Sequence, residues 1–280
     1  MSRVLIAGCG YVGSELARRL LAGGHSVWGL RRGNAELPPG VERICADLAQ
    51  AGSLAGLPAD LEHVVYAAGP GGREQADYRR AYLEGLGGLL QALVDQGQRP
   101  RRVLFVSSTS VYAQDRGERV DESSPTRPSR GSSRRLLEAE ALLHASPFPG
   151  TVVRFAGIYG PGRTRLLESV RGGEPLATEG PPRITNRIHR DDCAGVLEHL
   201  MGLPVVEPLY LGVDCEPVDE DTLRAWLADE LAVVSPPRRL GGSEGFRGKR
   251  CDNGRLRSSG YVFRYPGFRD GYAPLIRAER

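Results

Sequence analysis

Short apolar runs alternate with longer segments of helical periodicity over the first 155 residues. The runs are typical of buried strands, and the segments between them space apolar side chains three and four positions apart, as helices do. The predicted strands are Val4–Ala7, Ser26–Leu30, Glu42–Cys45, His63–Ala68, Val103–Ser107 and Thr151–Phe155, and the predicted helices are Tyr11–Leu21, Glu74–Val94 and Ser133–His144. This alternation predicts an α/β fold of the Rossmann type, a doubly wound parallel sheet covered on both faces.

The pattern loosens after Phe155. Glycine- and proline-rich stretches surround a predicted helix at Thr164–Val170, and a helix at Arg190–Met201 precedes a strand at Leu209–Leu211. We expect a smaller C-terminal substrate lobe beside the Rossmann domain. The predicted division is a Rossmann domain over residues 1–156 with returning elements at about 188–213, and a lobe over residues 157–187 and 214–280.

Composition and charge exclude several function classes. A net charge of +3 provides no strong field for nucleic acid or a membrane surface, and no apolar stretch approaches the roughly 20 residues of a membrane span. The five cysteines include no close pair, which argues against a disulfide framework or a CxxC metal site and favours a cytoplasmic location. Of the 37 basic residues only Lys249 is a lysine, so chemistry that needs a titrating amine has a single candidate.

A glycine motif lies between the first predicted strand and the first predicted helix. Gly8, Gly10 and Gly13 form a Gly-x-Gly-x-x-Gly pattern, with Tyr11 and Val12 in its last gap. The first glycine permits a tight turn, the second lets backbone approach a pyrophosphate, and the third lets the helix pack on the strand. The motif therefore predicts a dinucleotide site at the N-terminus of this helix.

The end of the second predicted strand indicates which dinucleotide is bound. An acid there would accept hydrogen bonds from the ribose of NAD, whereas this chain has Arg31 and Arg32. Two guanidinium groups suit a 2′-phosphate and predict NADP(H) rather than NAD(H). The alternative is a solvated basic turn.

The next two predicted strands end in further candidates for the cofactor site. Asp47 and Leu48 follow the third strand, and Ala67, Ala68 and Gly69 follow the fourth. A doubly wound sheet binds its ligand at the carboxyl ends of its strands, so we expect these residues beside the dinucleotide.

The fifth predicted strand runs into a hydroxyl-rich segment, Ser107–Tyr112. Other polar or glycine-rich segments follow at Asp121–Pro125, Arg154–Gly162, Asn186–Asp192 and Lys249–Asn253. With the glycine motif and Asp47-Leu48, these segments resemble the landmarks of the extended short-chain dehydrogenase/reductase family, which includes sugar-nucleotide epimerases and dehydratases. The resemblance covers nearly the whole chain and implies a sugar nucleotide or similar polar small molecule as substrate.

The resemblance also implies catalytic roles. Ser108 matches the family's substrate-orienting hydroxyl, which a Tyr-x-x-x-Lys pair follows on the next helix. Aligning Arg135–Glu140 with that helix places Gly131 at the tyrosine and Arg135 at the lysine, and no Tyr-x-x-x-Lys occurs in the chain. The chain thus resembles an atypical subgroup, in which Arg135 can still hold the nicotinamide ribose through its fixed charge.

The identity of a replacement acid or base stays open. Tyr112 is a candidate catalytic residue beside Ser108, although a tyrosine at this landmark also suits a pocket wall or plain packing. For several other residues with suitable chemistry the plainer interpretation is structural. These residues are Tyr159, His189, Asp191, Asp192 and Lys249. The two aspartates lack a companion cluster of ligands, so we predict no metal.

Two functions follow from these patterns. The retained Ser108 favours an NADP-dependent oxidoreductase or epimerase that acts on a small-molecule substrate. The vacated tyrosine and lysine positions favour a non-catalytic dinucleotide-binding sensor or partner-binding module. A homodimer is also left open, because the apolar stripe from Tyr78 to Leu93 suits either a core or a dimer face.

Overall fold

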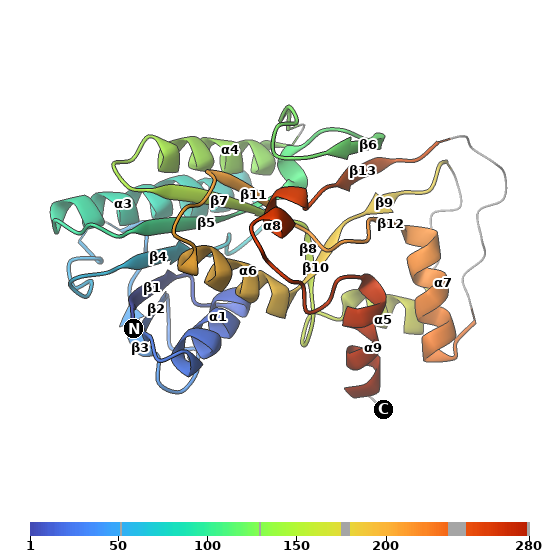
Figure 1. Ribbon diagram of the computed structural model, residues 1–280, viewed down its shortest axis with the longest axis horizontal. Helices are drawn as coiled ribbons and strands as arrows, with labels where there is room; N and C mark the ends of the chain where they lie inside the picture. Colours follow the sequence, from blue (N-terminus) through green and yellow to red (C-terminus); the bar gives the residue numbers. More distant parts are fainter. Residues whose placement is uncertain (51, 129, 175–179, 235–244, 279–280) are drawn as a thin grey trace. The chain divides into compact units, whose positions relative to one another are not determined.

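A parallel sheet forms the centre of the first of two structural units (Figure 1). The computed structural model describes residues 1–50, 52–128, 130–174, 180–234 and 245–278. In the described part of the chain the sheet has seven strands: β1 (Arg3–Ala7), β2 (Ser26–Arg31), β3 (Glu42–Cys45), β4 (His63–Tyr66), β5 (Arg102–Ser108), β7 (Gly150–Phe155) and β11 (Leu209–Gly212). The order is β11-β7-β5-β4-β1-β2-β3, so the chain reverses direction across the sheet between β1 and β4. This confirms the predicted doubly wound α/β fold.

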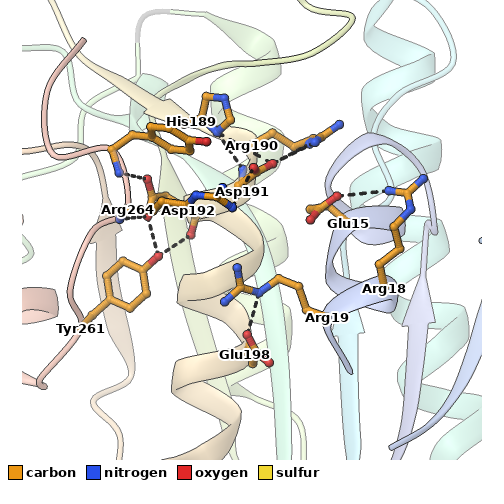
Figure 2. Close-up of polar contacts among 11 residues, drawn as sticks. Glu15, Arg18, Arg19, His189, Arg190, Asp191, Asp192, Glu198, Tyr261 and Arg264 are labelled. Carbon is orange, nitrogen blue, oxygen red and sulfur yellow. Dashed lines mark hydrogen bonds and ion pairs between the residues drawn. The ribbon is translucent and has the colours of Figure 1, made fainter. Parts of the chain in front are cut away.

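Helices cover both faces of the sheet. The helices α3 (Gly85–Asp95) and α4 (Gly131–His144) lie on one face, and α1 (Tyr11–Ala22) and α6 (Arg190–Gly202) lie on the other (Figure 1). Strands buried on both faces should be continuously apolar, and Val4–Ala7 is completely buried. On the second face, Arg19 Nε of α1 lies 2.7 Å from Glu198 Oε2 of α6 (Figure 2).

The predicted helix Glu74–Val94 is interrupted. The structure has a short helix α2 (Gln75–Arg79), a π-helical turn over Arg80–Glu84, and then α3. The Tyr66 hydroxyl donates to the Ala81 carbonyl within the π-helical turn. Apolar periodicity alone reveals neither this wide turn nor the hydrogen bond within it.

A buried ion pair fixes α4 on the sheet. The Arg154 guanidinium of β7 donates to both carboxylate oxygens of Glu140, from Nε at 3.0 Å and from Nη2 at 2.6 Å. Ser107 Oγ of β5 also donates to Glu140 Oε1, at 2.6 Å. Removing Glu140 or Arg154 would leave the other charge buried without its partner, so this group specifies where α4 sits.

The second unit comprises residues 112–125, 155–192 and 211–280, in its described parts. It contains paired short strands: β6 (Arg116–Val120) with β13 (Gly248–Cys251), β8 (Gly157–Tyr159) with β10 (Arg187–His189), and β9 (Ile184–Thr185) with β12 (Val218–Asp219). Its helices are α5 (Arg165–Arg171), α7 (Glu220–Leu231), α8 (Gly254–Ser258) and α9 (Phe268–Ala278). Leu167, Leu227 and Phe268 of α5, α7 and α9 share one buried apolar cluster. The predicted domain boundaries stay a prediction.

A buried histidine at the start of β4 makes the stability of the first unit depend on pH. Burial, reinforced by the positive charge of Arg102, lowers the pKa of His63 to about 4, and His63 Nδ1 has no hydrogen-bond partner among the described residues. An unfolded histidine has a pKa of about 6.5, so the unfolded chain binds the extra proton first as the pH falls. His63 therefore does not reduce the free energy of unfolding above pH 6.5. As the pH falls from 6.5 toward 4, protonation of His63 in the unfolded chain lowers that free energy by up to about 1.4 kcal/mol per pH unit.

We expect the free energy of unfolding of His63→Leu to change less between pH 4 and pH 6.5 than that of the wild type, because leucine has no titratable group and still fills the buried position. Urea unfolding between pH 4 and pH 8 measures it, and the same substitution at the exposed His144 is the control. Parallel curves for the wild type and His63→Leu would contradict the assignment.

Candidate functional site

The turn between β1 and α1 packs tightly against the end of β4. Gly8 has a φ of +89°, a left-handed conformation that favours glycine, and a Cβ there would overlap the Ala68 main-chain nitrogen. A Cβ on Gly13 would lie 2.9 Å from both the Gly8 carbonyl oxygen and the Ile6 side chain. These two glycines are thus needed by the protein's own packing. Ala67 continues the ladder, since its N–H donates to the Ala7 carbonyl at 2.8 Å.

Gly10 stands in a more open environment. Among the described residues, a Cβ there would have one atom within 4 Å, the Gly8 carbonyl oxygen at 3.9 Å. Gly10 is also the N-cap of α1, no side chain caps the helix, and its first turn contains no acidic residue. Tyr11 and Val12 begin this helix, and Val12 is buried. The open glycine and the positive end of the helix dipole fit the pyrophosphate of a dinucleotide.

Two arginines surround this turn. Arg31 Nη1 donates to the Cys9 carbonyl oxygen at 3.5 Å, which places the guanidinium group beside the glycine motif. Arg32 is exposed, and its Nη2 lies within 3.1 Å of where a Cβ on Gly71 would be, so it reaches the loop after β4. Neither arginine has a carboxylate within 4 Å among the described residues, which leaves both charges available to a ligand.

Asp47 lies at the end of β3 and is already paired. Its Oδ2 accepts from Arg80 Nη2 at 2.7 Å, and its Oδ1 accepts from the Ala49 N–H at 3.0 Å. Desolvation raises the pKa of the Asp47 carboxyl, but these hydrogen bonds and the charges of Arg80 and Arg32 outweigh it, so the pKa lies below its usual value. Asp47 is therefore held as a carboxylate, and the charge of Arg80 balances it. Leu48 follows, and its carbonyl oxygen leaves no room for a Cβ on Gly88.

Hydroxyl groups gather after β5. Ser108 Oγ accepts from the Ser110 N–H at 3.1 Å, and Ser133 Oγ of α4 donates to Ser110 Oγ at 3.0 Å. Ser133 is buried, and Ser110 is exposed. The structure therefore joins the hydroxyl-rich segment to the start of α4, where the resemblance places the catalytic pair.

The two positions aligned with that pair have other neighbours in the structure. A Cβ on Gly131 would overlap the side-chain amide of Gln75, so Gln75 fills the space beside this glycine. Arg135 Nη1 lies 2.6 Å from Glu138 Oε2 in a half-exposed ion pair. Gly131 has no side chain, and a guanidinium group such as that of Arg135 is a poor general acid or base.

Tyr112 belongs to the second unit, and its hydroxyl is engaged. It donates to the Asp121 carbonyl at 2.8 Å, and the ring is buried. The Tyr112 carbonyl oxygen in turn accepts from Lys249 Nζ at 2.8 Å. These contacts fix the loop after β5, so the phenol is placed to hold this loop.

The polar residues at the start of α6 form a structural network (Figure 2). Asp192 is completely buried and accepts from the Tyr261 hydroxyl and from the N–H groups of Arg264 and Tyr265, at 2.8 to 2.9 Å. His189 Nδ1 accepts from the Asp191 N–H at 3.2 Å, and burial lowers the pKa of this histidine. Each group is used within the network, which supports the structural interpretation of these residues.

The described residues contain neither a cluster of metal ligands nor a helix that could span a membrane. No group of three or more His, Cys, Asp or Glu side chains in the described ranges is arranged to hold a metal ion. No helix there is long and apolar enough to cross a membrane.

The comparisons with known proteins identify the family. Residues 4–190 match the model of the NAD dependent epimerase/dehydratase family, and the chain belongs to this family. Protein YeeZ of Escherichia coli K12 is 28% identical over 286 residues, which cover 95% of this chain and 97% of that protein. A 3-diazoavenalumate denitrifying reductase of Streptomyces is 30% identical over 216 residues, which cover 69% of this chain and 70% of the reductase.

Solved structures share the whole fold. A proposed NAD-dependent epimerase/dehydratase of Methylobacillus flagellatus is 40% identical with a TM-score of 0.86, and the match covers 100% of this chain and 99% of that chain. MoeE5 in complex with UDP-glucuronic acid and NAD is 22% identical with a TM-score of 0.83 over the same shares. The second likeness shows the fold alone.

Sequence reasoning did not find three residues of this region. Arg80, Gln75 and Glu140 lie on helices that carry no recognisable motif, and each becomes informative only through a partner distant in the sequence. The only sequence signal for Gln75 is Gly131 at the position aligned with the family's tyrosine, because a glycine there leaves space for another side chain.

We expect Gly10→Val to fold normally and to lose dinucleotide binding. The protein leaves room for a side chain at this position, but the branched group would lie where the pyrophosphate approaches. Titration calorimetry with NADPH, together with thermal unfolding, measures both effects. Gly8→Val is the matched control, because its clash with Ala68 should lower the melting temperature as well. Unchanged binding by Gly10→Val would refute the site.

Proposed function

We propose that this protein binds NADP(H) at the turn between β1 and α1. The observation that carries the proposal is the pair of unneutralised guanidinium groups, Arg31 and Arg32, beside an open Gly10. Arg80 supports it, because its ion pair with Asp47 offsets the acid at the end of β3. A 2′-phosphate would receive charge-assisted hydrogen bonds from such a cluster. Leu48, Ala67 and Gly69 would line the same edge of the sheet.

We further propose that the protein is an oxidoreductase or epimerase acting on a sugar nucleotide or a similar polar small molecule. Bound NADPH supplies a hydride, and NADP⁺ accepts one. Membership of the epimerase/dehydratase family supports this activity, as does the similarity to a reductase. MoeE5, which has the same fold, binds NAD and sugar nucleotides. Ser108, exposed in part at the end of β5, would orient the substrate.

A non-catalytic sensor of NADP(H) is the second candidate. The packing of Gln75 against Gly131 favours it, because this space holds an amide rather than an acid or base. Arg135 can still attract the nicotinamide ribose hydroxyls through its charge, although Glu138 shares it. Under this proposal the protein binds NADPH tightly and reports its occupancy to a partner.

Location and assembly are part of the proposal. All five cysteines are free thiols, which is compatible with the reducing cytoplasm. A homodimer stays a prediction: Leu86 and Leu93 of the apolar stripe are used in the core, and Val94 at the end of α3 is exposed.

We expect the protein to prefer NADP(H) over NAD(H) by roughly tenfold to a hundredfold. Charge-assisted hydrogen bonds contribute about 1.5 to 3 kcal/mol, which corresponds to that ratio. Arg31→Ala should remove most of the preference, and the matched control Arg43→Ala changes an arginine that donates to the carbonyls of Gly33 and Ala35. Calorimetry with both cofactors measures the ratio. Equal affinities in the wild type would exclude NADP(H) selectivity.

A single-turnover assay separates the two candidate functions. The sensor candidate predicts tight cofactor binding without hydride transfer. The oxidoreductase or epimerase candidate predicts slow transfer, because general acid–base help worth about 10² to 10⁴ in rate has no donor at Gly131. Transfer of deuterium from ring-deuterated sugar nucleotides to NADP⁺, which oxidises the sugar alcohol to a ketone, detects even slow chemistry by mass spectrometry. Ser108→Ala is the control. Robust transfer that collapses in Ser108→Ala would establish catalysis and reject the sensor.

A further inference from the structure

The lysine of the second unit lacks an ionic partner. Lys249 lies on β13, is half-buried, and donates from Nζ to the Tyr112 carbonyl oxygen at 2.8 Å. Within the described ranges no carboxylate oxygen lies within 4 Å of this Nζ. Burial is the main cause that lowers the pKa of the amine. An ammonium group that loses water without gaining a paired opposite charge is costly.

The neighbouring acids are committed elsewhere. Asp115 Oδ1 accepts from the Gly248 N–H at 2.7 Å, and Glu118 Oε2 accepts from the Arg116 N–H at 2.7 Å. Asp252 Oδ2 accepts from Arg119 Nε at 2.8 Å. These hydrogen bonds engage the three carboxylates with other groups, and none of them forms an ion pair with the lysine.

The strand that carries Lys249 is held from several sides. Asn186 Nδ2 donates to the Lys249 carbonyl oxygen at 2.9 Å, and Asn186 Oδ1 accepts from the Cys251 N–H at 2.8 Å. Gly248 has a φ of +78°, and a Cβ there would overlap the Ile184 carbonyl oxygen. Lys249 shares its face of the strand with the buried Cys251, since side chains alternate along a strand. These contacts hold the backbone of β13 in place, and with it the position from which the Lys249 side chain extends.

We propose that Lys249 Nζ is an anion-binding group that takes the phosphate or carboxylate of a small molecule. An ammonium has three N–H donors, and one of them is used by Tyr112, so two remain for a ligand. Arg183 is a second cation whose charge acts on Lys249, and among the described residues no carboxylate oxygen lies within 4 Å of Nζ to compete with an anion. The inference names an anionic substrate class, and in that respect rests on the proposed function.

Competitive labelling with acetic anhydride tests this proposal, because Lys249 is the only lysine and its acetylation is read unambiguously by mass spectrometry. The reagent attacks neutral amines, so Lys249 should label at lower pH than a lysine peptide in the same mixture. We expect UDP or D-glucuronate to slow the labelling at least tenfold. UDP identifies a phosphate ligand, and glucuronate identifies a carboxylate ligand. Potassium chloride at equal ionic strength is the control for screening.

Variants separate binding from structure. Lys249→Met should weaken binding of the protecting anion by roughly tenfold to a hundredfold in calorimetry, and Lys249→Arg should retain part of it. Arg250→Ala removes the same charge from the opposite face, where Arg250 Nη1 donates to the Gly117 carbonyl, and should leave binding unchanged. Because Lys249→Met also removes a desolvated charge, its melting temperature should equal or exceed that of the wild type.

Three results would overturn the inference: labelling unaffected by both anions, equal slowing by potassium chloride, or a lower melting temperature of Lys249→Met with anion binding intact. The third result would mean that Lys249 has a structural role, which is to hold the Tyr112 carbonyl. The labelling uses neither NADPH nor turnover, so its failure leaves the cofactor proposal standing, and loss of NADPH binding would not affect it.

Discussion

The close approach of the β1–α1 turn to the end of β4 is the constraint on which the rest of the structure depends. Gly8 adopts a left-handed conformation, and no Cβ fits between it and Ala68. Because β1 and β4 flank the point where the strand order reverses, this contact sets the edge of the sheet at which a doubly wound fold binds its ligand. Gly13 then lets α1 begin directly above it, and the N-terminus of that helix faces the same edge.

Electrostatics at this edge is asymmetric. Asp47 is the acid at the end of β3, and Arg80 pairs with it, while Arg31 and Arg32 have no carboxylate partner among the described residues. Arg80 lies in the π-helical turn and reaches Asp47 from there. The Ala81 carbonyl of the same turn accepts a hydrogen bond from the Tyr66 hydroxyl. A local irregularity in a helix is therefore coupled to the charge of the proposed cofactor site. Apolar periodicity predicts one long helix here and does not reveal the π-helical turn that carries Arg80.

The second unit uses buried polar groups mainly to fix backbone. Asp192, Asn186 and Tyr112 each hold a main-chain segment through hydrogen bonds. Lys249 differs because its charge is not matched by a carboxylate, although acids lie nearby. In a low-dielectric environment such an unmatched charge is expensive, and functional sites are where proteins tolerate that cost.

The sequence by itself determined the alternating strands and helices of the first unit, because burial on both faces and a 3.6-residue period leave direct marks on residue order. It also located the glycine motif and the arginine pair, since both are contiguous in the chain. Only the tertiary structure decided that Gln75 fills the space beside Gly131, that Arg154 and Ser107 hold Glu140, and that Lys249 lacks a carboxylate. The short strands of the second unit also escaped prediction, because two to five residues carry too little periodicity. These features depend on side chains that meet across tens or hundreds of residues, and no local pattern records which partner each one finds.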